Sequence, residues 1–240
     1  MKMGDLFAGI GGFSLAFKWV GFDVAWQVEI DEFATKVLEK NFPKTKRYGD
    51  IRNVEPKELE KVDVICGGFP CQPFSVAGKR RGIEDDRYLW GEMFRIIRGV
   101  KPAWVIVENV VNFANMAIEQ TLADLESEGY ETQSFIIPAV AVNAEHRRDR
   151  VWIIAHNGSE RIQRCREEKV FWKYFLSWSE NCGRITEERK RSHLHTPRLC
   201  RSLYGLPYGV DRVRALGNAI VPQIAYNIAL AIKIIEECTE

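Results

Sequence analysis

Short apolar runs and amphipathic stretches alternate along the first 155 residues. No other pattern in the sequence restricts the possible folds as strongly. The apolar runs predict strands over Lys2–Phe7, Val24–Val28, Val62–Cys66, Trp104–Val107, Phe135–Ile137 and Val151–Ala155. The amphipathic stretches predict helices over Phe13–Val20, Glu32–Asn41, Leu89–Val100 and Ile118–Gly129. A repeated order of strand and helix is typical of an α/β domain whose mostly parallel sheet carries helices on both faces. Ligands bind such sheets at the carboxyl ends of the strands, so we expect the chemistry to follow each strand.

The alternation stops after residue 155. Between His156 and Arg201 the chain holds 11 Lys and Arg against 6 Asp and Glu, together with an aromatic cluster over Phe171–Trp178. A regular apolar helix is predicted again over Ile220–Ile235. We therefore predict three parts, which are a first domain over residues 1–155, a small basic lobe over residues 156–205, and a segment over residues 206–240 that returns to the first domain.

Composition excludes several classes of protein. Hydrophobic residues make up 46% of the chain and charged residues 28%, which excludes disordered and collagen-like chains. No run of about 18 apolar residues is present, and the N-terminus does not resemble a signal peptide. None of the six cysteines forms a C-x-x-C pair, so we expect reduced thiols and a cytoplasmic location. We predict no metal, because the spacing matches no common zinc pattern in the stretch that holds Cys165, Cys182, His193, His195 and Cys200.

A glycine-rich turn, Asp5–Phe13, joins the first predicted strand to the first predicted helix. Glycines allow a tight turn and a close approach of a ligand to the backbone, although a turn without a ligand has the same pattern. Glu29 follows the second strand, where nucleotide-binding folds hold ribose hydroxyls. Asp50 lies near the end of a third strand region and can accept from an adenine amino group. Each carboxylate alone fits a helix cap or a surface charge, but together they indicate an adenosine-containing cofactor.

The strongest chemical signal lies in the segment Cys66–Ser75. An apolar strand runs into two glycines, and Cys71 then lies between two prolines, which restrict the local backbone. A reactive cysteine needs partial exposure and nearby positive charge, which the basic run Lys79–Arg81 supplies. The other interpretation, a buried structural cysteine, suits Cys66 in the strand better than Cys71 in the loop.

An acid and two arginines follow the later strands. Glu108 and Asn109 come at the end of an apolar run that starts at Trp104. A carboxyl group at the edge of an apolar pocket can keep its proton and act as an acid. Arg148 and Arg150 alternate at strand spacing, so we expect their side chains to share a face. A solvated charge run is the usual explanation, but the position before a buried strand makes a clamp for phosphate or substrate competitive.

These blocks together resemble the DNA (cytosine-5) methyltransferases of the prokaryotic or phage type. The matching blocks occur in the order of that family and are Asp5–Phe13, Glu29, Gly49–Ile51, Gly67–Ser75, Glu108–Val110, Arg148–Val151 and Gly217–Pro222. The resemblance implies the Rossmann-like fold of S-adenosylmethionine-dependent methyltransferases, with residues 156–205 as a small basic target recognition lobe.

The resemblance also implies roles for single residues. Those implied to bind the cofactor, with Glu29 on the ribose and Ile30 on the adenine face, are Phe7, Gly9, Gly11, Gly12, Glu29, Ile30, Asp50, Ile51, Pro70, Leu89, Asn218 and Ile220. Those implied to be catalytic are Cys71, Glu108, Arg148 and Arg150. Those implied to contact DNA are Gln72, Ser75, Lys79, Arg80 and Arg81.

The implied reaction is methyl transfer to C5 of a cytosine in double-stranded DNA. Addition of the Cys71 thiolate to C6 turns C5 into a nucleophile, and Glu108 donates to ring N3. The cytosine has to leave the base stack before it can react. We expect the loop after Cys71 to close on the displaced nucleotide.

Two departures from the family pattern stand out. His146 replaces the glutamine that opens the arginine block. The interval from His156 to Leu216 is short for a target recognition domain. It indicates a short recognised sequence, or help from a second subunit or from a partner such as a restriction endonuclease. Two other interpretations stay open, which are a tRNA cytosine-5 methyltransferase and a DNA-binding relative with weak catalysis. A nicotinamide dehydrogenase would leave the cysteine, glutamate and arginine blocks unexplained.

The net charge of +1 is the sum of a basic stretch and a slightly acidic remainder of the chain. Outside His156–Arg201 the remaining 194 residues carry 23 basic and 27 acidic side chains. Contact with DNA needs a basic face rather than a basic protein. We therefore expect DNA to lie against the lobe, the loop after Cys71 and the region around Arg148.

Overall fold

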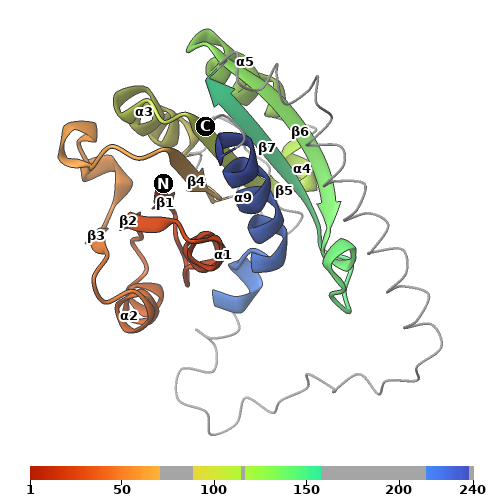
Figure 1. Cartoon of the computed structure of the whole chain (residues 1–240), viewed down its shortest axis with the longest axis horizontal. Helices are drawn as coiled ribbons and strands as arrows, with labels where there is room; N and C mark the ends of the chain where they lie inside the picture. The colour runs from red at the N-terminus through yellow and green to blue at the C-terminus, as the bar shows by residue number, and fades with distance from the viewer. Residues whose placement is uncertain (71–88, 115–116, 158–214, 238–240) are drawn as a thin grey trace, which may run out of the picture.

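The computed structural model describes residues 1–70, 89–114, 117–157 and 215–237, and in this part of the chain seven strands form one sheet (Figure 1). The strands are β1 (Lys2–Leu6), β2 (Asp23–Val28), β3 (Lys46–Tyr48), β4 (Val64–Gly67), β5 (Trp104–Val110), β6 (Tyr130–Pro138) and β7 (Asp149–Asn157). Their order is β3-β2-β1-β4-β5-β7-β6. The first five strands run parallel, whereas β7 runs antiparallel to both of its neighbours. The predicted α/β class with a mostly parallel sheet is confirmed.

Helices cover both faces of this sheet, as predicted. They are α1 (Gly12–Val20), α2 (Glu32–Asn41), α3 (Trp90–Val100), α4 (Val111–Ala114), α5 (Ile118–Ser127) and α9 (Pro222–Glu237). Ile65 and Cys66 are consecutive in β4 and therefore point to opposite faces. Cys66 packs in a core with Phe17 of α1 and Ile232 of α9, and Figure 1 shows these two helices side by side. Ile65 packs in the other core with Met93 of α3, on the face that α5 also covers.

The C-terminal helix belongs to the core of this domain. Among the described residues, the segment Ala215–Glu237 is long and apolar enough to cross a membrane by length and composition alone. The helix is interrupted at Ala219–Val221, and α9 begins directly afterwards. At helical spacing α9 buries Ile224, Ala225, Ile228, Ala229, Ile232 and Ile235. Lys233 Nζ also donates to the Val20 carbonyl at the end of α1, at 2.9 Å. These are the contacts of a core helix in a folded domain.

Two strands differ most from the sequence prediction, each for a physical reason. The apolar pattern gives no bounds for β3, although a strand region was expected before Asp50, because its three residues are Lys, Arg and Tyr and form a strand only by pairing with β2. Strand β6 spans Tyr130–Pro138 rather than Phe135–Ile137. It pairs with β7 along its whole length, and this pairing holds the mostly polar residues before Phe135 in the strand as well. Strand β7 takes up the first two residues of the predicted lobe over residues 156–205. The other residues of that lobe lie outside the described residues.

Candidate active site

The turn after β1 has a backbone that favours glycine. Phe7, Gly9 and Gly11 have φ angles of 55°, 54° and 89°, in the left-handed region. A Cβ atom at position 11 would lie 2.8 Å from Phe42 Cε2 and 2.9 Å from Leu38 Cδ2, at the end of α2. The turn therefore packs directly against α2, and its open main chain lies at the carboxyl end of β1.

Alanine in place of Gly11 is expected to destabilise the domain. The positive φ strains an L side chain by about 1–3 kcal/mol, and the new methyl group must displace two packed apolar side chains. We expect a lower melting temperature, measured by calorimetry. Gly91→Ala is the control, because an added Cβ there meets nothing within 4 Å. An unchanged melting temperature in Gly11→Ala would contradict the geometry of this turn.

Glu29, directly after β2, is tied to the glycine turn. Its Oε2 accepts from the Gly9 N–H at 2.7 Å, and its Oε1 accepts from the Asp31 N–H at 2.8 Å. Both oxygens keep acceptor capacity, because each has more than one lone pair and accepts a single hydrogen bond. The neighbouring Ile30 is 64% exposed, although isoleucine is usually buried. The structure thus brings a fixed acceptor and an apolar surface to the edge of the turn.

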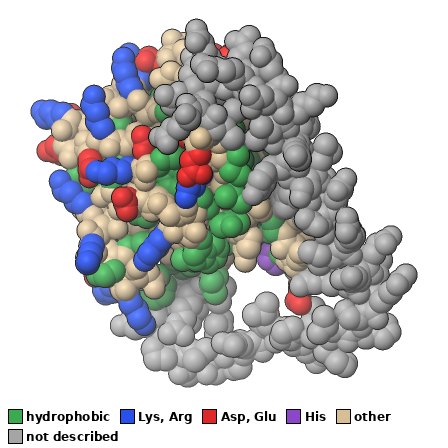
Figure 2. All heavy atoms as spheres, in the orientation of Figure 1, with side chains coloured by type: hydrophobic (Ala, Val, Ile, Leu, Met, Phe, Trp, Pro, Cys, Tyr) green, Lys and Arg blue, Asp and Glu red, His purple; other side chains and the backbone are tan. Residues whose placement is uncertain are grey.

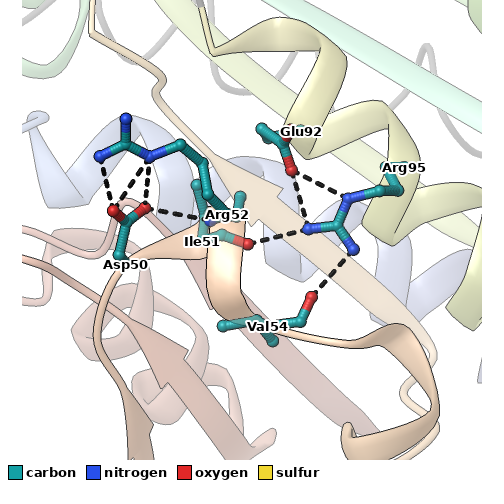
Figure 3. Close-up of polar contacts among 6 residues, drawn as sticks. All are labelled: Asp50, Ile51, Arg52, Val54, Glu92 and Arg95. Atoms are coloured by element: carbon teal, nitrogen blue, oxygen red, sulfur yellow. Dashed lines mark hydrogen bonds and ion pairs between the residues drawn. The ribbon is translucent and has the colours of Figure 1, made fainter.

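Asp50 caps the short 3-10 helix η1 (Ile51–Asn53), just after β3. Its Oδ1 accepts from the Arg52 N–H at 3.0 Å, and its Oδ2 accepts from Arg52 Nη2 at 2.6 Å (Figure 3). These hydrogen bonds lower the pKa of Asp50, so its carboxylate is ionised at neutral pH and can accept further hydrogen bonds. The side chain of Ile51 is buried in the core, so only its main chain can face a ligand. Sequence reasoning missed Arg52, because a surface arginine beside a cap carries no pattern of its own.

A buried polar network beneath the glycine turn was also missed. Asp5 Oδ2 accepts from the Ser14 N–H at 3.1 Å and from Ser14 Oγ at 2.6 Å, and Gln27 Nε2 donates to Ser14 Oγ at 2.8 Å. Asp5 lies in register with Gln27 of β2 and with Cys66 of β4. Burial raises the pKa of Asp5 to about 7, against the Ser14 hydrogen bonds that lower it. Asp5 stands in the strand that opens the first motif, which is the signal that could have found it.

The raised pKa of Asp5 makes a prediction for stability. An acid whose pKa rises from 3.8 to about 7 on folding stabilises the fold fully below pH 4, and this contribution is lost as pH rises through 7. Asp5→Asn keeps an acceptor for Ser14 and has no charge to bury. Relative to the parent chain, we expect it to gain roughly 2–4 kcal/mol between pH 5 and pH 8, measured by denaturant unfolding. Parallel stability curves for the two proteins would contradict a buried, titrating Asp5.

The chain leaves β4 through a segment that the core holds firmly. The ring of Phe69 is buried, with its centroid 5.8 Å from Trp90 and 5.3 Å from Phe113. Asn109 Nδ2 donates to the Phe69 carbonyl at 3.3 Å. Pro70 follows and is exposed. The residues next in line lie outside the described residues, namely Cys71, Gln72, Ser75, Lys79, Arg80 and Arg81.

Glu108 is a buried acid at the edge of the sheet where the parallel strands have their carboxyl ends. It lies inside β5 and its side chain is about 10% exposed, with Arg150 Nε donating to its Oε1 at 2.9 Å. A Cβ atom at Gly68 would lie 3.1 Å from Glu108 Oε2, so the carboxyl group packs on the backbone that leads to position 71. Burial raises the pKa of Glu108 to about 7, against the charges of Arg150 and Arg148 that lower it. The group can therefore either donate or accept a proton near neutral pH.

The prediction that Arg148 and Arg150 share a face rested on strand spacing, and Arg148 lacks strand geometry. It precedes β7 and has a φ of 36°, but its charge acts on Glu108 together with that of Arg150. Its Nη2 donates to the carbonyls of Gly217 and Ala219, each at 2.7 Å. Arg148 thus joins the Glu108 region to the Gly217–Pro222 block across about 70 residues of sequence, which no local pattern can indicate.

The remaining predicted cofactor residues lie near the glycine turn or at the start of α3. A Cβ atom at Gly12 would lie 2.6 Å from Ile220 Cγ1, so the first turn of α1 touches the C-terminal block. Asn218 is exposed in that block. Leu89 directly precedes α3 and is partly buried against the core. The structure therefore brings the described parts of the first, second, third and last blocks to one edge of the sheet.

The sheet order and its one reversed strand define the class of fold, which is that of S-adenosylmethionine-dependent methyltransferases. The profile of the C-5 cytosine-specific DNA methylase family matches residues 1–200, so the chain belongs to this family. The family resemblance of the sequence motifs is thereby confirmed.

Several characterised proteins are similar to the chain. The type II methyltransferase M.HhaI of Haemophilus parahaemolyticus is 36% identical over 175 residues, covering 70% of this chain and 52% of the relative. M.HgiCII of Herpetosiphon aurantiacus is 36% identical over 238 residues, covering 93% of this chain and 51% of the relative. The crystal structure of a Spodoptera frugiperda DNMT2 mutant aligns with a TM-score of 0.56 at 28% identity, covering 65% of this chain and 50% of that one. The chain spans about half the length of the curated relatives that it matches.

Proposed function

We propose that the chain transfers a methyl group from S-adenosylmethionine to C5 of a cytosine in double-stranded DNA, through a covalent bond between Cys71 Sγ and C6. The observation that carries this proposal is Glu108, a buried carboxyl group with a pKa of about 7 that pairs with Arg150. It packs against Gly68, three residues before Cys71 in the chain. A thiol near an acid that holds a proton at neutral pH suits nucleophilic addition to a pyrimidine ring.

The residues around the glycine turn fit the adenosine half of the cofactor. Glu29 offers acceptor lone pairs to ribose hydroxyls, and Ile30 offers an exposed apolar surface to a base. Asp50 offers an ionised acceptor to an amino group. An added Cβ atom at Gly9 would meet nothing within 4 Å, so the main chain there is open to a ligand. When bound, the cofactor supplies an electrophilic methyl group on its sulfonium.

The proposed chemistry divides one difficult step into easier ones. The Cys71 thiolate forms a bond to C6, and the electrons of the C5–C6 double bond move into the ring as N3 takes a proton from Glu108. C5 can then accept the methyl group. Water removes the C5 proton, the bond between Sγ and C6 breaks, and N3 returns its proton to Glu108. Arg150 keeps the Glu108 carboxyl oriented and prevents its pKa from rising further. Because C5 is buried in a stacked duplex, the cytosine has to be flipped out first.

Double-stranded DNA is the proposed macromolecular substrate. On the face drawn in Figure 2, Lys and Arg side chains of the described residues are dispersed among Asp and Glu rather than gathered into one patch. We propose that the phosphate contacts come from Lys79, Arg80 and Arg81 and from the basic stretch after residue 156. A restriction endonuclease or a second subunit as partner, and a cytoplasmic location, belong to the same proposal.

A transfer assay tests the proposal directly. The chain is incubated with tritiated S-adenosylmethionine and either mixed-sequence duplex DNA or tRNA, and binding of S-adenosylhomocysteine is measured by calorimetry. Label in DNA, with bisulfite sequencing to locate 5-methylcytosine, is the expected result. Label in tRNA alone would replace the proposed substrate. Cofactor and DNA binding without any transfer would favour a relative that has lost catalysis.

A further inference from the structure

Helix α3 contacts both the segment after β3 and the segment after β4. On one side it packs against η1 and against η2 (Pro56–Glu58), the two short helices that follow Asp50. On the other side, a Cβ atom at Gly67 would lie 2.8 Å from Met93 Cε, and Trp90 packs on Phe69. One helix therefore supports both the Asp50 turn and the backbone that leads to Cys71.

A single arginine makes the polar contacts between α3 and the Asp50 turn. Arg95 Nη2 donates to the Ile51 carbonyl at 2.9 Å, and Arg95 Nη1 donates to the Val54 carbonyl at 2.9 Å (Figure 3). Glu92, one turn earlier, accepts from Arg95 Nε at 2.9 Å and so fixes the guanidinium plane. The two carbonyls lie at the start and just past the end of η1, so this contact spans the whole short helix.

An apolar contact one turn further along α3 holds this helix against the same segment. A Cβ atom at Gly99 would lie 2.2 Å from Pro56 Cβ, so only glycine lets α3 approach η2 this closely. Gly99 lies four residues after Arg95 and therefore on the same face of the helix. The face of α3 that carries these two residues is thus shaped to the segment from Ile51 to Pro56.

We propose that Arg95 is a positioning residue for the adenosine part of the cofactor, acting through the main chain of the Asp50–Ile51 turn. Its two hydrogen bonds fix η1, whose first main-chain group belongs to Ile51 and whose cap is the Asp50 carboxylate. The inference rests on the proposed function, because it assumes that this turn faces the cofactor. Arginine suits the role because its planar fork reaches two carbonyls at once, whereas a lysine has one flexible ammonium group.

Arg95→Met and Arg95→Lys test this proposal, with Arg98→Met as the matched control. Arg98 lies one turn from Arg95 on the same helix, with a side chain 60% exposed and an ion pair to Glu128. For Arg95→Met we expect a roughly tenfold higher Kd for S-adenosylhomocysteine, because two charge-assisted hydrogen bonds are lost. Arg95→Lys should recover part of this loss. Arg98→Met should keep the affinity of the parent chain.

The further readouts separate positioning from simple stability. The same increase in Kd is expected for 5′-methylthioadenosine, which keeps the adenosine and lacks the amino-acid end. In the transfer assay the KM for S-adenosylmethionine should rise while kcat stays within about threefold. A Kd within twofold of the parent value, with only a lower melting temperature, would overturn the proposal and leave the proposed function intact. A parent chain that binds no S-adenosylhomocysteine would overturn both. If Arg95→Met does not fold, Arg95→Lys decides by the same two measurements.

Discussion

Alanine in place of Cys71 is expected to abolish methyl transfer and to leave cofactor binding unchanged. Without the thiolate no bond to C6 can form, and C5 of cytosine is too weak a nucleophile to take the methyl group by itself. Loss of a covalent nucleophile costs on the order of 10⁴-fold or more in rate. The rate is measured as tritium transfer to DNA, and the Kd for S-adenosylhomocysteine is measured by calorimetry on the same sample.

A trapping experiment adds a direct readout for the same residue. On duplex DNA with 5-fluorocytosine at the target position, the parent chain should form a covalent complex stable to denaturing electrophoresis, because fluorine cannot leave as a proton does. Cys71→Ala should form none. Cys66→Ala is the control, because Cys66 is fully buried and burial raises the pKa of its thiol far above the neutral range. Trapping that persists in Cys71→Ala would place the nucleophile elsewhere.

Glutamine in place of Glu108 is expected to lower the single-turnover rate of methyl transfer by about 10²–10⁴-fold. The amide keeps a donor near N3 but has no proton to transfer. In the parent chain the protonated form of Glu108 becomes scarce as pH rises through its pKa of about 7, so the rate should fall on the alkaline side. In Glu108→Gln this alkaline fall should disappear. The measurement is a series of single-turnover rates between pH 5.5 and pH 9.

Glu119→Gln is the matched control for the acid. Glu119 is exposed in the first turn of α5 and undergoes the same change of side chain as Glu108 in this comparison. It should keep both the rate and the pH profile of the parent chain. An alkaline limb that survives in Glu108→Gln would assign that limb to another group, and a rate within tenfold of the parent would remove Glu108 from the proposed proton transfer.

Local patterns were sufficient for much of the fold. Short apolar runs located β1, β2, β4, β5 and β7, because these strands lie far enough inside the sheet for most of their own residues to be apolar. The same pattern missed β3, whose polar residues are ordered by β2 rather than by their own burial. It also began β7 at Val151 instead of Asp149, and it gave no sign of the positive φ of Arg148, which has no signature in an arginine.

The candidate reactive groups and their order along the chain were determined by the sequence alone, including Cys71, Glu108 and the glycine turn, because the residue types themselves carry that chemistry. For the described residues, the tertiary structure decided how the carboxyl groups are protonated and which contacts hold them in place. It gives Glu108 and Asp5 pKa values near 7, because desolvation depends on what packs around a carboxyl group rather than on its neighbours in sequence. It also joins Arg95 to Ile51 and Arg148 to Gly217, contacts between residues 44 and 69 positions apart. Such pairs form only when the sheet has brought the ends of its strands to one edge.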